Sequence, residues 1–389
     1  MSLPRLSAPA ATATPRPGRA RTGPLEVVSA DRGAERSRFI RLPYRLNRDD
    51  PHWVPPLRSD VRRLLSPRGP FREQGETSLF LARRPGGPVG RIAAILDPVR
   101  PGPDGGPSGA FGLFTCADDP EAASALTDAA GAWLRERGVT EMTGPYDLTI
   151  NDECGTLIEG FDGPPAIMTA HNPPYHADLL RHAGFDKAKD LWSWELAADH
   201  MRLDWLTRLA DQVERRTGAT VRTVDFGSLP AESELMRGLL NASLKDNWGS
   251  RDMGEREFRD HVRRLKPLLR PGTVVFVEVD GVPVGTGLLV PDVNPAIATA
   301  RGRLGPLSLL RVLRTARTTD RGRVAFMGVA EEYRRRGLHV LLTARLFEWS
   351  GIRRAELSWI LEDNTGMNAF LERLGSRRHR VHRIWRKAL

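Results

Sequence analysis

Two segments of the chain share one pattern of apolar runs and turn residues, and each predicts a β-hairpin. The first segment begins at Thr77 and the second at Gly272. In both, a strand-like apolar run leads into a turn that ends Gly-x-Pro-Val-Gly, and a second apolar run follows. The chain therefore contains two copies of the same sheet-forming unit.

Other landmarks recur at nearly the same spacing. The turn glycines of the two hairpins are separated by the same number of positions as Trp53 and Trp248. Gly184 and Gly375 differ by almost that number, and each follows a helix-like stretch and precedes a long strand that contains tryptophan. Agreement between independent landmarks predicts a duplicated domain.

The duplication divides the chain into three predicted parts. Residues 1–25 form a tail rich in Pro, Ala, Gly and Arg, which we expect to be disordered because it offers little to bury. Residues 26–197 and 198–389 form the two repeats. The pattern of each repeat is helix, hairpin, strand, helix, strand, helix, strand, which predicts an α/β fold with a mixed central sheet.

Composition narrows the class of protein. The chain is 40% hydrophobic and 27% charged, as in ordinary globular proteins, and no apolar run approaches the ~18 residues of a membrane span. The N-terminus has no apolar core like that of a signal peptide, so we expect a cytoplasmic location. Cys116 and Cys154 predict buried reduced thiols and no metal site. The net charge of +10 suits a polyanionic partner without selecting one.

The most informative segment spans residues 323–351. Residues 324–329 predict a buried strand, and the leucines that follow, together with Trp349, have helical spacing suited to packing on a sheet. Between strand and helix lies Glu-Glu-Tyr-Arg-Arg-Arg-Gly-Leu-His. A helix N-terminus binds phosphate through its unpaired N–H groups, Gly337 allows close backbone approach, and the arginines add charged donors.

This segment resembles the pyrophosphate loop of the GNAT N-acetyltransferase superfamily, R/Q-x-x-G-x-G/A, with Arg334, Gly337 and His339 in its three defined places. Residues 356–375 are similar to the family's fifth strand and following helix, and the resemblance covers most of residues 220–389. It implies two tandem GNAT-like domains and an acyl-coenzyme A (acyl-CoA) site in the second. The residues implied to contact the cofactor are Val329, Arg334, Arg335, Arg336, Gly337, Leu338, His339 and Asn364.

Three positions depart from that pattern or have a second explanation. His339 replaces the usual Gly or Ala, so its side chain must point away from the phosphates or contact them. Leu371 stands where many members have the tyrosine that protonates the leaving thiolate, so the proton comes from elsewhere or the thiolate leaves unassisted. Asn364 is explained equally well as a helix cap.

The first repeat has Ala-Asp-Asp-Pro-Glu in place of the basic loop, and these acids would repel pyrophosphate. We therefore expect one acyl-CoA per chain. Instead, residues 143–180 form a long loop rich in Gly, Pro, Asn and Asp, which is typical of a functional loop. We expect its polar side chains to line an acceptor pocket: Asp152, Glu153 and His171 as candidate bases, and Tyr146, Asn151, Asn172 and Tyr175 as substrate-binding residues.

The duplicated layout, this loop and the segment from Leu42 also resemble a bacterial two-repeat GNAT subfamily with members similar to bacterial ceramide synthases. That likeness implies an acyl-CoA-dependent N-acyltransferase whose acceptor is a small-molecule or lipid amine, with the oxyanion met by a backbone N–H near Val329. Residues 302–323 form a basic amphipathic segment, which predicts either contact with the inner face of the membrane or a helix packed on its own domain.

Two other functions fit parts of the sequence. An aminoacyl-tRNA-dependent tandem-GNAT transferase would suit the basic charge, but such proteins usually lack so intact a coenzyme A loop. A non-catalytic nucleic-acid-binding protein would use the Arg-rich tail. No recognition helix, zinc motif or aromatic RNA motif supports nucleic-acid binding, so we expect no nucleic-acid partner.

Overall fold

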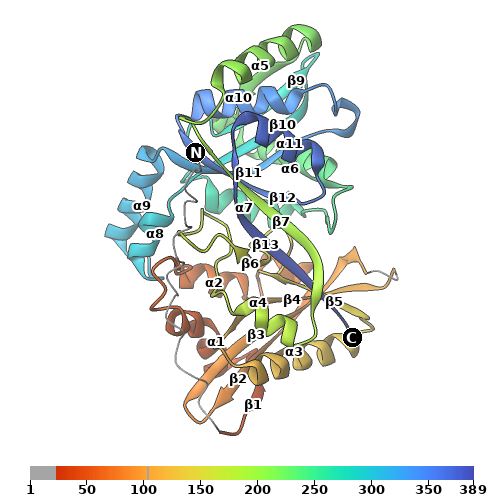
Figure 1. Cartoon of the computed structure of the whole chain (residues 1–389), viewed down its shortest axis with the longest axis vertical. Coiled ribbons are helices and arrows are strands. Elements are labelled where there is room, and N and C mark those ends of the chain that lie inside the picture. The colour runs from red at the N-terminus through yellow and green to blue at the C-terminus, as the bar shows by residue number, and fades with distance from the viewer. Residues whose placement is uncertain (1–22, 103–104) are drawn as a thin grey trace, which may run out of the picture.

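The computed structural model describes residues 23–102 and 105–389. Apart from its last three residues, the predicted tail (1–25) lies outside this range, so its predicted disorder stays a prediction. Two halves of similar build are stacked along the long axis of the molecule and share one continuous sheet (Figure 1). The predicted mixed sheet is confirmed.

Within the described residues the sheet has thirteen strands, of which twelve form an unbroken row. In spatial order these are β1 (Glu26–Ser29), β2 (Glu76–Arg84), β3 (Gly87–Pro101), β4 (Pro107–Cys116), β5 (Glu141–Tyr146), β13 (Arg377–Ala388), β7 (Asp186–Ala197), β12 (Arg354–Leu361), β11 (Arg321–Val329), β10 (Val282–Pro291), β9 (Val274–Val279) and β8 (Thr220–Thr223). The short β6 (Thr156–Glu159) pairs with β13 beside this row. In each half one pair is parallel, β4 with β5 and β11 with β12.

Helices cover both faces of the sheet. Those of the first half are α1 (Gly33–Leu46), α2 (Arg58–Leu64), α3 (Pro120–Arg135) and α4 (His176–His182), with the short η1 (Pro70–Glu73). Those of the second half are α5 (Leu203–Thr217), α6 (Leu229–Leu244), α7 (Glu255–Leu265), α8 (Asn294–Ala300), α9 (Pro306–Thr318), α10 (Leu338–Ser350) and α11 (Thr365–Leu374), with η2 (Phe226–Ser228) and η3 (Glu331–Tyr333).

The last strands of the two halves are exchanged. β13, from the end of the chain, lies beside β5 of the first half, and β7, from the end of the first half, lies beside β12 of the second. Trp385 of β13 is buried in the first-half core, and Trp194 of β7 is buried in the second-half core. The predicted boundary at residue 197 divides the sequence, whereas the packing crosses it, so neither core is complete without the other half.

The second-half core fixes the helix that opens the candidate phosphate site. Leu338, Leu341, Leu342 and Leu346 of α10 are buried against the sheet and α5, as their spacing predicts. Trp349, expected to pack in the same way, is 37% exposed. It lies in the last turn of α10, where the guanidinium of Arg345 stacks over its ring.

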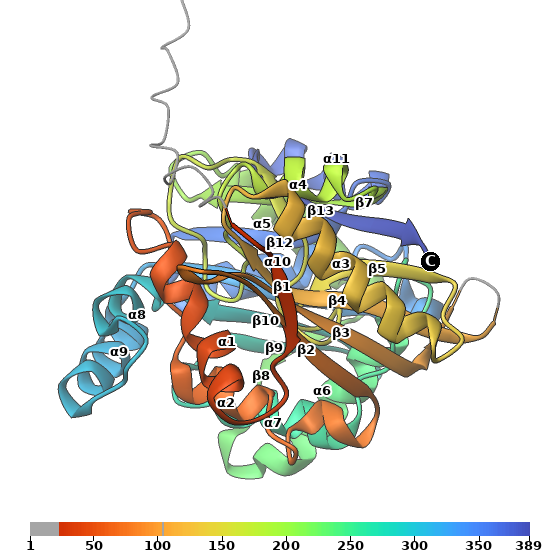
Figure 2. The same ribbon diagram turned by 90° about the horizontal axis from the view of Figure 1, so that it is seen from below.

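Helices α8 and α9 project from the side of the molecule in both views (Figures 1 and 2). Val312 and Ala316 hold α9 against the body, as the packed-helix interpretation predicts. Leu307 and Leu310, however, are 82% and 65% exposed. None of the helices within the described residues is long and apolar enough to cross a membrane. Both cysteines are buried free thiols, as predicted.

Candidate active site

The parallel strands β11 and β12 pair only at their beginnings and then separate. Their ladder joins residues 321–324 to residues 354–357. Beyond it, β11 continues against β10, whereas β12 continues against β7 after an irregularity that follows Leu357. The side chains of β11 from Ala325 to Val329 are only partly buried, although the strand lies inside a sheet. A ligand can therefore reach the backbone of both strands.

One backbone donor faces this separation. The N–H of Ala330 donates to the carbonyl of Val284 on β10, at 2.8 Å. Because successive N–H groups of a strand point to opposite edges, the N–H of Val329 is directed toward β12. This is the donor expected to meet an oxyanion.

The turn between β11 and α10 has the conformation of an anion-binding loop. Arg335 and Gly337 both have left-handed backbones, with φ of 64° and 85°. The turn is followed by the first N–H groups of α10, at Leu338 and His339, which precede any intrahelical acceptor. Alternating backbone conformations of this kind and a helix N-terminus together form a concave donor site for phosphate.

Side chains surround this turn with positive charge. Arg334, Arg335 and Arg336 are exposed. Arg334 donates to the carbonyl of Ser243, and Arg336 lies 4.8 Å from the centre of the Tyr333 ring. Arg334 also pairs with Asp246 at 3.5 Å, and both arginines keep further guanidinium N–H groups that can bind a pyrophosphate.

The sequence left alternatives at three positions around this loop. The His339 ring packs edge-on against Phe370 of α11, with 4.9 Å between the ring centres. Burial lowers the pKa of His339, so this side chain is neutral. Asn364 caps α11 by accepting the N–H of Met367 at 3.2 Å. Leu371 is fully buried in the second-half core, so this position supplies no proton.

The equivalent place in the first half is occupied by the protein's own carboxylate. Asp119 caps α3 by accepting the N–H of Ala122 at 3.1 Å, and it is paired with Arg84 at 2.8 Å. Burial alone would raise the pKa of Asp119, but the hydrogen bond from Arg84 and the other bonds to this carboxylate lower it below its ordinary value. Asp119 is therefore ionised at neutral pH. A negative charge already neutralises the N-terminus of α3.

A cavity of about 540 Å³ lies where the two halves meet. Its walls come from the segment around α1 and α2, the long loop predicted to be functional, the end of α7, and α8 with α9. Five of the seven candidate acceptor-site residues line it, namely Tyr146, Asp152, Glu153, His171 and Asn172. Most of the rest of the lining is apolar, with Trp53, Leu57, Leu64, Ile297, Leu309 and Leu313 among it.

The four predicted substrate-binding residues lie in different surroundings. Asn172 accepts the N–H of Leu157 at 2.7 Å and donates to two carbonyls, so it holds the loop against β6. Tyr175 is not part of the lining, and its hydroxyl donates to the carbonyl of Cys116. Asn151 lines a second, smaller cavity instead. Tyr146 stays in the large cavity, 3.4 Å from a guanidinium nitrogen of Arg100.

Three carboxyl groups, Asp147, Asp152 and Glu153, lie in one wall of the large cavity. Burial raises their pKa values to about 7, about 6 and about 8, and repulsion from neighbouring carboxylates adds to this for Asp147 and Glu153. Arg91, Arg264 and Arg323 respectively oppose these shifts. Such a wall carries proton-accepting groups that titrate near neutral pH.

His171 forms a dyad with Asp50, a residue that sequence reasoning did not select. The Nε2 atom of His171 lies 2.9 Å from Oδ2 of Asp50, and the other carboxylate oxygen accepts the N–H of His52. Nδ1 of His171 is buried and has no hydrogen-bond partner among the described residues. Because a carboxylate only accepts, Nε2 donates to Asp50, and in this tautomer the second ring nitrogen, Nδ1, is the basic one. An imidazole oriented in this way is a suitable general base.

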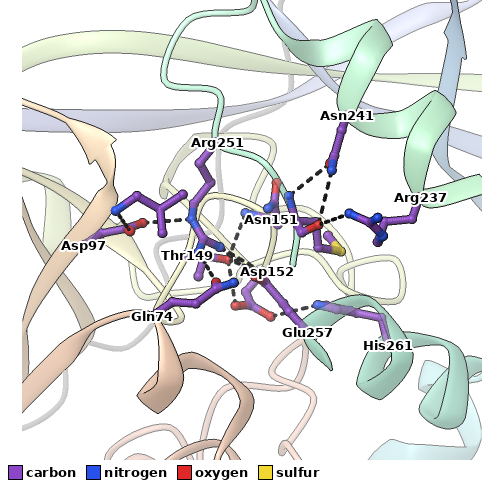
Figure 3. A network of polar contacts seen from close by, with 12 residues as sticks. Gln74, Asp97, Thr149, Asn151, Asp152, Arg237, Asn241, Arg251, Glu257 and His261 are labelled. Atoms are coloured by element: carbon purple, nitrogen blue, oxygen red, sulfur yellow. Dashed lines mark hydrogen bonds and ion pairs between the residues drawn. The ribbon is translucent and has the colours of Figure 1, made fainter. Parts of the chain in front are cut away.

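A buried polar network joins the halves beside this wall (Figure 3). Arg251 of the second half makes ion pairs with Asp97, at 2.9 Å, and with Glu257, at 2.7 Å. Thr149 donates to Asp152, whose other oxygen lies 3.6 Å from Nε2 of His261. Arg251 and His261 were missed by sequence reasoning, because no motif marks them and because Asp97 and Asp152, with which they interact, lie in the other repeat.

No group of three or more His, Cys, Asp or Glu side chains in the described part of the chain could hold a metal ion. The polar groups of the site are these carboxyls, the dyad, and the backbone donors of β11 and α10.

Comparison with known proteins identifies the family. The model of the acetyltransferase (GNAT) family matches residues 235–376, which contain the separated strands and the phosphate loop. The chain is 34% identical over 382 residues to a Caulobacter vibrioides protein named bacterial ceramide synthase, covering 94% of this chain and 98% of that protein. It is 33% identical over 361 residues to the Escherichia coli protein YghO, covering 90% and 92%.

Among solved structures, a tandem GNAT protein from the clavulanic acid biosynthesis pathway has the same fold. It aligns with a TM-score of 0.54 at 15% sequence identity, covering 94% of this chain and 98% of that one. The chain thus belongs to the GNAT acetyltransferase family as a tandem member, and it is an N-acyltransferase.

Proposed function

We propose that this enzyme transfers the acyl group of acyl-CoA to a long-chain amine at a membrane surface. The proposal rests on one combination of features in the same molecule. These are the separated strands β11 and β12, the donor-rich turn before α10, and a 540 Å³ cavity with a carboxyl wall. Pyrophosphate suits the turn, and the pantetheine arm suits the separated strands. A cationic amine with an apolar tail suits the cavity.

One acyl-CoA per chain follows from the charges of the two helix N-termini. Gly337 opens the second-half helix with three exposed arginines before it. Asp119 caps the first-half helix, and a pyrophosphate there would meet a fixed carboxylate.

The acceptor arrives as an ammonium ion and must lose a proton before it attacks. The wall of Asp147, Asp152 and Glu153 attracts the cation, and Nδ1 of His171 takes the proton. The amine nitrogen then forms a C–N bond to the thioester carbon, whose oxygen develops negative charge opposite the N–H of Val329. The C–S bond breaks, the nitrogen releases its second proton to a carboxylate of the wall, and because Leu371 offers no proton, sulfur leaves as thiolate.

The wall formed by α8 and α9 supports a lipid acceptor. Leu309 and Leu313 line the cavity, while Leu307 and Leu310 of the same helix are exposed to solvent. The arginines beside them on α9 are exposed as well, at positions 311, 314 and 317. An exposed leucine face bordered by cations suits an anionic bilayer, where each arginine contributes about 1 kcal/mol. With α9 docked on a bilayer, the cavity would open toward the lipid.

The relative named bacterial ceramide synthase supports a long-chain amine as the acceptor. The test is an assay in which purified protein, acyl-CoA and amines of increasing chain length are incubated with anionic vesicles, and the amides are quantified by mass spectrometry. We expect turnover to increase with amine length and to need anionic lipid at low salt. Small polar amines acylated as fast as long-chain amines would contradict the lipid acceptor. Transfer only from aminoacyl-tRNA would contradict acyl-CoA use.

A further inference from the structure

A second cavity, separate from the amine cavity, lies under α6 and α7. It has a volume of about 120 Å³ and is enclosed by α6, α7 and the face of β9, β10 and β11. Its lining is apolar apart from Asn151, Glu232, Ser233 and His261. The apolar part comes from leucine, valine, phenylalanine and methionine side chains, so a ligand there must itself be apolar.

The cavity borders the place where an acyl group would emerge. Ala325 and Phe326 of β11 line it, and these are the residues at which β11 leaves its ladder with β12. Register with β10 shifts at the same point, because Leu288 faces Phe326 and Leu289 faces Val324. Ala325 is thus the extra residue of a β-bulge, which turns the strand locally. A thioester carbonyl at the N–H of Val329 lies three residues along β11 from Phe326, so an acyl chain that runs along this strand would reach the cavity.

The two cavities meet at shared residues. Met168, His261 and Leu265 line both of them, and Asn151 lines the smaller one at the polar network of Figure 3. The Nδ2 atom of Asn151 is buried without a hydrogen-bond partner among the described residues. The small cavity therefore has Asn151 and His261 where it meets the carboxyl wall, and most of its remaining lining is apolar, which suits a hydrocarbon chain.

Several side chains of α6 and α7 that line the cavity are not completely buried. Met236, Leu240 and Phe258 keep 7 or 8% exposure, whereas Leu341, Leu342 and Leu346 of the same half are completely buried. Met236 and Met253 contribute flexible side chains that adapt to a ligand of variable shape. An apolar cavity of roughly 150 Å³ holds one benzene molecule in an engineered protein, so this space accommodates about four to six carbon atoms.

We infer that this cavity binds the apolar chain of the acyl donor, so that acyl chain and amine chain occupy separate cavities that meet at the carboxyl wall. The inference rests on the proposed function and specifies the donor. It predicts that affinity for the donor increases with acyl length until the cavity is filled, by about fourfold for each buried methylene. It also predicts that the size of the amine cavity does not determine the acyl length at which affinity stops increasing.

The test is calorimetric titration with a series of non-hydrolysable acyl-CoA thioethers of increasing acyl length. Ser233→Leu adds side-chain volume to the small cavity, and we expect affinity to stop increasing at a shorter chain than in wild type. Met236→Ala enlarges it, and the increase should extend to longer chains. Ile297→Phe, on the wall of the large cavity, is the matched control and should leave the acyl series unchanged.

Outcomes distinguish the inference from the function on which it rests. If coenzyme A and all thioethers bind with one affinity whatever their length, the acyl cavity is refuted while acyl-CoA use stands. A length limit that responds to Ile297→Phe and not to Ser233→Leu would assign the acyl chain to the large cavity and also refute the inference. If no thioether and no coenzyme A binds, the proposed function and the inference are both wrong.

Discussion

Replacing Asp50 with asparagine changes which nitrogen of the candidate base, His171, carries the proton, while it leaves the packing around the ring in place. One oxygen of Asp50 accepts the N–H of His52 at 2.9 Å, and the other lies 2.9 Å from Nε2 of His171. In Asp50→Asn the amide oxygen remains on His52, which turns the amide NH2 toward His171. Nε2 must then accept, so the imidazole proton moves to Nδ1 and the lone pair proposed to act as base is lost.

The expected effect is catalytic. A positioned general base contributes about 10²- to 10⁴-fold, which corresponds to about 3–5 kcal/mol of activation free energy. The lost charged hydrogen bond costs about 1–2 kcal/mol of folding stability, because Asp50 is partly exposed. We therefore expect kcat to fall by about two to four orders of magnitude, with little change in KM for acyl-CoA and a modest decrease in melting temperature.

Asp49→Asn is the matched control, since its side chain is 79% exposed and its ion pair is with Arg48. It removes the same charge one position away and should leave kcat unchanged. The assay is steady-state amide formation at saturating acyl-CoA and amine, with thermal unfolding in parallel. Wild-type kcat in Asp50→Asn, or an equal loss in both variants, would refute the dyad as the base. His171→Ala should lose the same activity and regain part of it with added imidazole.

Three further predictions concern the rest of the chain. Deleting residues 1–24 should change neither melting temperature nor turnover, because the tail is expected to be disordered, and a large loss of either would show that it docks. Arg311, Arg314 and Arg317 replaced together by Gln should weaken co-sedimentation with anionic vesicles without unfolding the protein, and unchanged sedimentation would exclude α9 as the contact. Burial raises the pKa values of Asp152, Asp147 and Glu153 to about 6, 7 and 8, so their contribution to stability is complete below about pH 4 and is lost as pH rises toward 8. Glu153→Gln should flatten the fall in melting temperature between pH 5 and pH 8. A fall as steep as in wild type would show that Glu153 does not titrate as proposed.

The sequence predicts local features of this protein better than features that join its halves. Alternating apolar runs and the strand–turn–helix around Gly337 depend on neighbours in sequence, so the hairpins, the turn before α10 and helix α10 itself were predictable. The exchange of β7 and β13 was not, because Trp194 and Trp385 occupy equivalent places in the two repeats and either half could have kept its own strand.

The candidate site shows the same limit. Asp152, Glu153 and His171 were found because they lie in one conspicuous loop. Asp50 and His261 were missed because each meets its partner only across the fold, at 2.9 Å and 3.6 Å. Asn172 and Tyr175 illustrate the opposite case, since polar loop residues that look available for substrate are used to hold the loop itself.

The measurement that tests the central claim most directly is calorimetric titration of the full chain with acyl-CoA. The account predicts one site per chain, abolished by Gly337→Val and retained in Gly351→Val, a substitution at the other end of α10 where the backbone is also left-handed. A Cβ at Gly337 would lie 2.8 Å from a methyl group of Val213. Arg336→Glu therefore provides a second test that does not involve this contact. It should weaken acyl-CoA binding by its change of charge alone. The same substitution at the exposed Arg373 is its control. Two equivalent sites per chain, or affinity unchanged in both Gly337→Val and Arg336→Glu, would contradict the account.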